Sequence, residues 1–198
     1  MFGYDISSNP GSLDPQYASD RESYLIIGSV FEGLFRIGAD GNAEKAMAES
    51  YTVSDDGLTY NFKLKQDRYW TDVNGYNKKV TAADFVFGFR RLFLPETRAP
   101  KASEYFCIKN SDKINSGEIT DLSQLGVTAQ GDYSLTIELQ YTEPSFAMLL
   151  AMPAAMPCNE EYFIKAQGKY GLDAERTASN GPFYVKTWNY DAWSNNNN

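Results

Sequence analysis

The stretch LGVTAQGDYSLTIEL, residues 125–139, decides the class of fold. Apolar and polar residues alternate from Leu125 toward Gly131 and Asp132, and alternate again away from that pair to Leu139. Successive side chains of a β-strand point to opposite faces, so each arm has one face to bury, and the Gly-Asp pair between the arms is typical of a turn. The stretch therefore predicts a β-hairpin in an antiparallel sheet.

A second hairpin is predicted in VSDDGLTYNFKL, residues 53–64, where aromatic and apolar residues alternate after an Asp-Asp-Gly turn signal. Two adjacent carboxylates could in principle perform acid–base catalysis. Asp before Gly is, however, favoured in turns, because its side chain bonds to the local backbone. We therefore interpret Asp55 and Asp56 as turn residues.

Two helices are predicted from apolar spacing and from a capping pattern. Residues 22–35 carry apolar side chains at helical spacing. The second helix is predicted to begin at Thr81, whose hydroxyl can accept a backbone N–H three residues on, while Asp84 reaches back to the Thr81 backbone. Its aromatic residues recur at helical spacing until Pro95 ends the helix. We interpret this aromatic stripe as part of the core.

Shorter elements complete the prediction. A short helix follows Pro144, another is capped by Asn159, and strands are predicted at residues 1–6 and 183–188. Residues 96–120 show no regular pattern. Helices and hairpins are mixed without strict βαβ alternation, so we expect an α+β fold with a mostly antiparallel or mixed sheet.

The composition argues against several classes of function. The chain of 198 residues has a formal net charge of −8, and a negative surface repels phosphates, so no nucleic acid partner is expected. It contains no histidine, the commonest general base and metal ligand. We therefore expect no enzyme, no catalytic residue, no metal and no cofactor. The longest apolar stretch, residues 147–156, is too short to cross a membrane.

The two cysteines, Cys107 and Cys158, do not form a metal-binding pattern. In an oxidising compartment they could form one disulfide, which would contribute roughly 4 kcal/mol to stability in the chain-entropy model. The alternative is a pair of buried free thiols, and this is the reading that we favour.

Several segments resemble the family 5 solute-binding proteins, which include oligopeptide-, dipeptide- and nickel-binding members. Each segment is weak evidence alone, but five occur in the family's order with sensible gaps. They are SLDP (12–15), VFEGL (30–34), AMAES (46–50), VSDDGLTYNFKL (53–64) and VTAADFVFGFRRL (80–92). Two more, SGEITDL (116–122) and SNGPFY (179–184), resemble the oligopeptide-binding branch.

The resemblance implies a fold like that of class II periplasmic binding proteins, with lobes built on mixed sheets. Residues 1–31 are expected to begin the first lobe, residues 32–155 to form the small second lobe, and residues 156–198 to return to the first lobe. Family members continue with a further large C-terminal lobe. We therefore expect this chain to be an N-terminal fragment that lacks it.

The resemblance also implies a function. Relatives of the oligopeptide-binding type hold an extended peptide between lobes through backbone hydrogen bonds, which give affinity without reading side chains. They deliver it to the permease subunits of an ABC transporter. Such proteins are extracytoplasmic, either in the periplasm or lipid-anchored at the outer face of the cell membrane. Any N-terminal signal or lipid-attachment cysteine is expected to have been removed from this chain.

Six ligand-binding candidates follow from the resemblance: Ser19, Asp20, Arg21, Lys101, Asn180 and Gly181. The first three are expected to offer backbone groups to the peptide, with a plain surface loop as the alternative. Lys101 stands where oligopeptide-binding relatives have a groove tyrosine, and its alternative is a solvated lysine. The last two are expected near the crossing between lobes, where a turn is the reading that we favour over contact with the ligand. Groups that capture the peptide termini are expected in the missing lobe.

Two other functions stay open at this point. A relative of the same fold could take another solute, such as a dipeptide, a nickel chelate, a sugar or a signalling peptide. The chain could also be a sensor or interaction module that uses this fold without serving a transporter.

Overall fold

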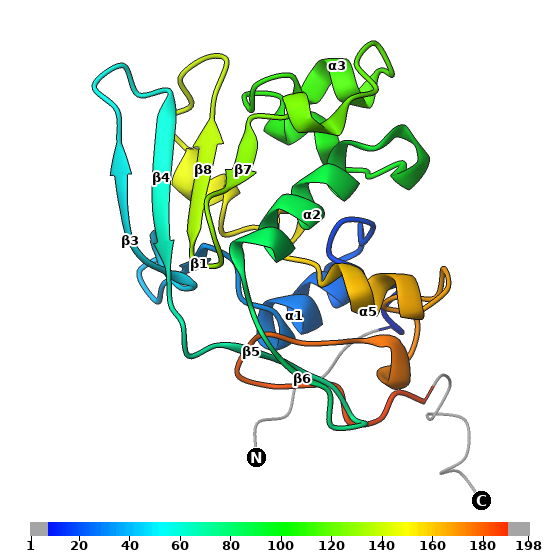
Figure 1. Ribbon diagram of the computed structural model, residues 1–198. Helices are drawn as coiled ribbons and strands as arrows, with labels where there is room; N and C mark the ends of the chain where they lie inside the picture. Colours follow the sequence, from blue (N-terminus) through cyan, green and yellow to red (C-terminus); the bar gives the residue numbers. More distant parts are fainter. Residues whose placement is uncertain (1–7, 190–198) are drawn as a thin grey trace, which may run out of the picture.

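The computed structural model describes residues 8–189. An antiparallel sheet of four strands, in the order β3-β4-β8-β7, forms one side of the molecule (Figure 1). Strands β3 (Ala48–Val53) and β4 (Thr59–Leu64) form one hairpin, and β7 (Val127–Ala129) and β8 (Ser134–Glu138) form the other. Because β4 also pairs with β8, the two hairpins share one sheet. Both hairpin predictions are confirmed.

The two faces of this sheet differ as the alternation predicted. Tyr51 lies opposite Phe62, and Phe62 opposite Leu135, so the three share one face of the sheet, on which Phe62 and Leu135 are buried and Tyr51 is 41% exposed. The rings of Tyr51 and Phe62 stack with their centroids 5.8 Å apart. On the other face the Thr136 hydroxyl donates to Oδ1 of Asn61 at 2.8 Å, and both residues face solvent more than the core.

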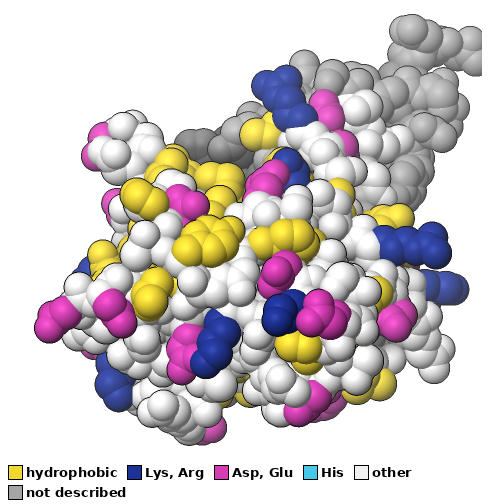
Figure 2. Space-filling view, turned by 90° about the horizontal axis from the view of Figure 1, so that it is seen from above, with side chains coloured by type: hydrophobic (Ala, Val, Ile, Leu, Met, Phe, Trp, Pro, Cys, Tyr) yellow, Lys and Arg dark blue, Asp and Glu magenta, His cyan; other side chains and the backbone are white. Residues whose placement is uncertain are grey.

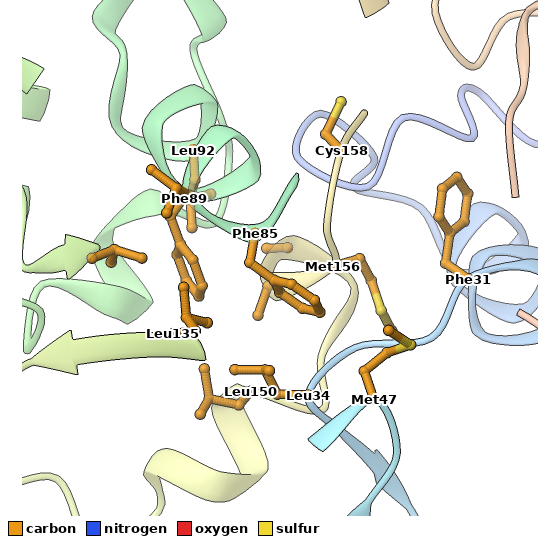
Figure 3. Packing of buried hydrophobic residues seen from close by; sticks show 14 of the residues in the cluster. Phe31, Leu34, Met47, Phe85, Phe89, Leu92, Leu135, Leu150, Met156 and Cys158 are labelled. Carbon is orange, nitrogen blue, oxygen red and sulfur yellow. The ribbon is translucent and has the colours of Figure 1, made fainter. Parts of the chain in front are cut away.

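Helix α2 (Ala82–Phe93) packs against β7 and β8. Its predicted start is confirmed: Thr81 and Asp84 form a capping box, in which the Thr81 N–H donates to Oδ2 of Asp84 at 2.8 Å. The aromatic stripe is buried, with Phe85 and Phe89 pointing into the core that Figure 3 shows. The stripe is therefore core, as the sequence indicated.

The remaining elements are short. Strand β1 (Phe35–Ile37) pairs with β2 (Ala43–Lys45), and β5 (Tyr69–Thr71) pairs with β6 (Asn77–Lys79). The other helices are α1 (Arg21–Val30), α3 (Ser111–Asn115), α4 (Phe146–Leu149) and α5 (Glu160–Lys165), with 3₁₀ turns at Pro95–Thr97, Ala102–Tyr105, Leu122–Gln124, Pro153–Ala155 and Ala174–Arg176. Helices mix with antiparallel sheets, so the predicted α+β class is confirmed.

Helix α1 is shorter than predicted. It ends at Val30, and Phe31 already has extended backbone, with φ −115° and ψ 156°. The next residue, Glu32, bonds through its N–H and its C=O to the side chain of Asn180, 148 positions along the chain. Local apolar spacing cannot reveal such a distant partner, so the predicted extension of this helix to residue 35 is wrong.

The predicted strand at residues 183–188 is also wrong. This segment has no assigned secondary structure, and Phe183 and Tyr184 are 57% and 47% exposed. A strand needs a neighbour to pair with its backbone groups, and no strand of the described residues pairs with this segment. The other predicted terminal strand, at residues 1–6, lies outside the described residues.

Both cysteines are buried and free. Burial raises the pKa of the Cys107 thiol to about 11 and that of the Cys158 thiol to about 12. Because the thiolate is the reactive form, we expect neither cysteine to react with a chromogenic disulfide reagent near neutral pH in the native protein. Both should react after unfolding in urea. The released chromophore measures the reaction, and fast labelling of native protein would contradict the expectation.

Candidate ligand-binding groove

A groove of about 410 Å³ lies beside the end of α1, strand β1 and residues 151–156, and we call it the α1 groove. Its lining is mainly apolar. The apolar side chains that line it include Phe31, Ile37, Ala151, Met152, Pro153, Met156 and Pro182. Sites for small ligands are typically concave and mostly apolar, with a few placed polar groups. The α1 groove has that character.

The charged side chains at this groove are paired with one another. The Glu32 carboxylate, only 13% exposed, lies 3.7 Å from Nη1 of Arg36 and 3.6 Å from Nε of Arg68. Arg36 also binds Glu44, with Nε 2.6 Å from Oε1. Both Glu32 and Arg36 line the groove, yet each has an opposite charge beside it. The groove therefore presents an apolar surface whose bordering charges are balanced.

The backbone under the groove is fixed by the segment around Asn180. Its side chain accepts from the Glu32 N–H at 3.0 Å and donates to the Glu32 carbonyl at 2.8 Å. The Gly181 N–H donates to the Val30 carbonyl at 2.9 Å. A Cβ at Gly181 would lie 2.8 Å from the Val30 carbonyl carbon, closer than real contacts, so only glycine fits here. Asn180 and Gly181 thus fix the backbone of residues 30–32, which carries the lining residues Phe31 and Glu32.

Side chains from distant parts of the sequence also meet in the core next to the groove. Met156 directly follows the 3₁₀ turn at Pro153–Ala155, and Met47 directly precedes β3. Figure 3 shows the two side chains pointing toward one another. Gly33 allows this close approach, since a Cβ there would lie 3.1 Å from Sδ of Met156. The core beneath the groove is therefore tightly packed around Gly33, Met47 and Met156.

The predicted residues Ser19, Asp20 and Arg21 lie at the N-terminal end of α1. The Asp20 side chain caps the helix and accepts from the N–H of Ser23 at 2.8 Å and from its hydroxyl at 2.7 Å. Ser19 and Arg21 are exposed. Tyr24, one turn further along the helix, lines the α1 groove. The structure therefore places the three residues at the start of α1, with the Asp20 side chain occupied by capping.

Lys101 lies directly before the 3₁₀ turn at Ala102–Tyr105. Its ammonium binds Oε1 of Glu104 at 2.6 Å. Burial raises the pKa of the Tyr24 hydroxyl, and the positive charge of Lys101 works in the opposite direction. That electrostatic interaction places Lys101 close to a residue that lines the groove. None of the six predicted residues is among those that line the groove.

Sequence reasoning missed the side chains that do line the groove. Phe31 was read as part of a helix stripe, and Met152 and Met156 as part of an apolar run. The sequence did carry one signal, because Pro153 interrupts that run. An apolar run that cannot continue as a helix near a predicted chain crossing is a candidate lining for a groove.

A second and larger hollow, about 580 Å³, lies over Arg91 on α2. Tyr17, Phe87 and Phe163 are among its lining residues. The Arg91 side chain at its floor already binds both carboxylate oxygens of Asp14 and stacks 3.9 Å from the centroid of the Phe163 ring. Because this cation has its partners inside the protein, we take the α1 groove as the candidate site.

The described residues contain no group of three or more His, Cys, Asp or Glu side chains that could hold a metal ion. Within residues 8–189, no helix is both long and apolar enough to span a bilayer. Figure 2 shows one face of the molecule, on which acidic, basic and hydrophobic side chains are interspersed. That face has no broad basic surface of the kind that nucleic acid phosphates require.

A family model and several curated proteins match most of this chain. Residues 42–194 match the family described as bacterial extracellular solute-binding proteins, family 5 Middle. A dipeptide-binding protein of Lactococcus lactis is 36% identical over 98% of this chain, and a probable deoxycholate-binding periplasmic protein of Escherichia coli is 32% identical over 95%.

Among solved structures, the substrate-binding domain of an oligopeptide ABC transporter from Bacillus anthracis superposes with a TM-score of 0.89 at 37% identity. The aligned region covers 94% of this chain and 35% of the Bacillus anthracis chain. The two curated relatives are each covered over 34% of their length, so the chain spans about a third of the proteins that it matches. The matched region exceeds half of the chain, and the chain belongs to the family 5 bacterial extracellular solute-binding proteins.

Proposed function

We propose that this chain is the front part of a longer extracytoplasmic protein that binds peptides for uptake by an ABC transporter. The observation that carries the proposal is the α1 groove, an apolar hollow in which each lining charge has an opposite charge beside it. An extended peptide can lie along such a groove, since its backbone bonds to protein backbone and its side chains fill apolar and hydrated space.

The proposal includes the lobe boundaries at residues 31 and 155. The segments that it assigns to different lobes are joined by hydrogen bonds. Thr71 and Ser179 exchange backbone hydrogen bonds of 2.8 Å, and the Tyr162 hydroxyl donates to Oδ2 of Asp72 at 2.8 Å. Two lobes joined at such a crossing could close over a ligand by rotating about it. Permease subunits of the transporter are the proposed protein partners.

In this proposal the protein lies outside the cytoplasm, in the periplasm or on a lipid anchor at the outer face of the cell membrane. It performs no catalysis. The sequence has no histidine to act as a base, and both cysteine thiols have raised pKa values that keep them protonated at neutral pH. The groove therefore has the features of a binding site and lacks an activated nucleophile.

The direct test is to purify the longer protein from its own host and identify what it carries. Mass spectrometry of the released small molecules should find peptides, and adding them back to stripped protein should raise its melting temperature. A protein that carries only a non-peptide solute, and that gains no stability from a peptide library, would overturn the proposal.

A bile acid is the second candidate ligand. One relative, 32% identical, is named as a probable deoxycholate-binding protein, and a rigid apolar steroid would suit a groove lined by two methionines and two prolines. The same mass spectrometry separates the two candidates, because a steroid and a peptide have different masses and fragments. Thermal stabilisation by deoxycholate without stabilisation by any peptide would favour the bile acid.

Replacing Met152 with lysine is expected to weaken ligand binding in the longer protein at least about tenfold, which corresponds to about 1.4 kcal/mol. An ammonium group on the apolar lining would have to lose water without gaining a partner. Calorimetric titration with a recovered ligand measures the change. The control is Ile164→Lys, because Ile164 is 66% exposed on α5 and does not line the groove. Equal affinities in both variants would show that the α1 groove is not part of the ligand-binding site.

A further inference from the structure

The sequence contains two Asn–Gly pairs, at residues 74–75 and 180–181. We propose that Asn74 is a site of spontaneous chemical modification by water, and that Asn180 is protected from the same reaction by its place in the fold. Asparagine is a thermolabile residue in proteins. A following glycine makes it more reactive, since no side chain hinders the approach of the next backbone nitrogen.

The reaction needs only the protein and water. The backbone nitrogen of Gly75 attacks Cγ of Asn74, so that an N–Cγ bond forms, the Cγ–Nδ2 bond breaks, and Nδ2 leaves as ammonia with the proton of the Gly75 N–H. The product is a five-membered succinimide ring. Water then opens the ring at either carbonyl and leaves an aspartate or an isoaspartate. No oxidant or reductant takes part.

Every group that the reaction requires is engaged at Asn180. This residue is only 2% exposed, and its amide bonds to both backbone groups of Glu32 at 2.8 and 3.0 Å. The attacking nitrogen, on Gly181, donates to the Val30 carbonyl at 2.9 Å. Water cannot reach the amide, and the nitrogen cannot swing toward Cγ without breaking its bond. The reaction at this pair therefore requires local unfolding first.

The corresponding groups at Asn74 are much less constrained. Asn74 and Gly75 are exposed at the turn between β5 and β6. The Gly75 N–H reaches the Asp72 carbonyl only at 3.4 Å, beyond the usual range for a backbone hydrogen bond. Gly75 has a φ of +83° and no neighbouring atom within 4 Å of the place where a Cβ would stand, so this nitrogen has room to move.

Modification at this turn would act on a polar network. In the unmodified protein Nδ2 of Asn74 donates to Oδ2 of Asp72 at 3.3 Å. Asp72 also accepts from the Tyr76 N–H and from the Tyr162 hydroxyl, each at 2.8 Å, which joins the β5–β6 hairpin to α5. Burial would raise the pKa of Asp72, but these hydrogen bonds lower it overall. A carboxylate at position 74 would replace a donor with a like charge and loosen this junction.

The test is peptide mapping by mass spectrometry after incubation of the native chain at mildly alkaline pH. Deamidation is expected to be at least about tenfold faster at Asn74 than at Asn180, because the two bonds of the Asn180 amide to Glu32 and the bond from Gly181 to Val30 must open first. In urea the two pairs should react at similar rates, which isolates the effect of the fold. Equal rates in the native protein, or faster reaction at Asn180, would overturn the proposal.

The structural consequence has its own measurement. Asn74→Asp, which imitates one product, is expected to lower the melting temperature by about 2–4 °C, the shift typical of a modest loss in a protein of this size. Asn77→Asp is the matched control, because Asn77 is exposed on β6 and is not among the partners of Asp72. An Asn74→Asp variant as stable as the unchanged protein would show that the modification leaves the Asp72 network intact.

Discussion

Replacing Asp14 with alanine is expected to lower the free energy of unfolding by about 3–5 kcal/mol, because it leaves a buried cation without its counter-charge. Arg91 is only 4% exposed. Its Nη1 and Nη2 donate to the two oxygens of Asp14 at 3.0 and 2.5 Å, and Nη1 also donates to Oε1 of Gln16 at 2.8 Å. Without Asp14, the guanidinium would stay buried with one polar acceptor and the weakly accepting sulfur of Cys158, 3.4 Å away.

Urea unfolding measures this loss, and an exposed ion pair supplies the control. The Lys109 ammonium lies 2.6 Å from Oε2 of Glu138, but both side chains are about half exposed, so Glu138→Ala is expected to cost less than ~1 kcal/mol. A double variant, Asp14→Leu with Arg91→Met, should recover much of the loss, because an apolar pair needs no counter-charge. A loss under ~1 kcal/mol for Asp14→Ala would mean that water reaches Arg91.

The hairpins and the start of α2 could be predicted because their causes lie within a few residues. Strand alternation, a turn at Gly131 and the capping box of Thr81 with Asp84 are all local properties of the chain. The structure has Gly131 at φ +78°, a conformation that glycine adopts without strain. Elements that form for local reasons appear in the sequence as local patterns.

The end of α1 could not be predicted, because its cause is distant in the sequence. The apolar spacing continues beyond Val30, but Glu32 bonds to Asn180 instead of continuing the helix. The segment at residues 183–188 shows the reverse error, since it has the composition of a strand and no partner strand in the described residues. Both errors concern which distant segment of the chain a stretch bonds to, and a single sequence does not specify that.

The six residues named from the resemblance are not the residues that line the candidate groove. They lie at the start of α1, at Lys101 and at Asn180 and Gly181, and the last two bond to the backbone of Glu32 and Val30. The apolar lining from residues 151–156 was not predicted, because its exposure depends on how the chain crosses beside α1. Whether any of the six predicted residues touches a ligand stays a prediction, which a structure with bound ligand would test.

Replacing Asn180 with alanine is expected to lower the free energy of unfolding by about 2–4 kcal/mol, because it leaves the N–H and the C=O of Glu32 without partners in a largely buried place. In the longer protein it should also weaken ligand binding, since Phe31 and Glu32 would no longer be held at the groove. Asn61→Ala is the control, because Asn61 is exposed on the sheet and should cost less than ~1 kcal/mol.

Asn180→Asp separates the role of these two hydrogen bonds from that of side-chain volume. An ionised carboxylate could still accept from the Glu32 N–H, but it would place an oxygen against the Glu32 carbonyl, where the amide donated at 2.8 Å. Burial and this contact should raise the pKa of the new carboxyl in the folded state. The unfolded chain then releases its proton first, so stability should be nearly normal in acid and fall as the pH rises toward neutral. Urea unfolding across this range measures the change, and a pH-independent deficit equal to that of Asn180→Ala would show that the hydrogen bond to the Glu32 carbonyl does not hold the crossing.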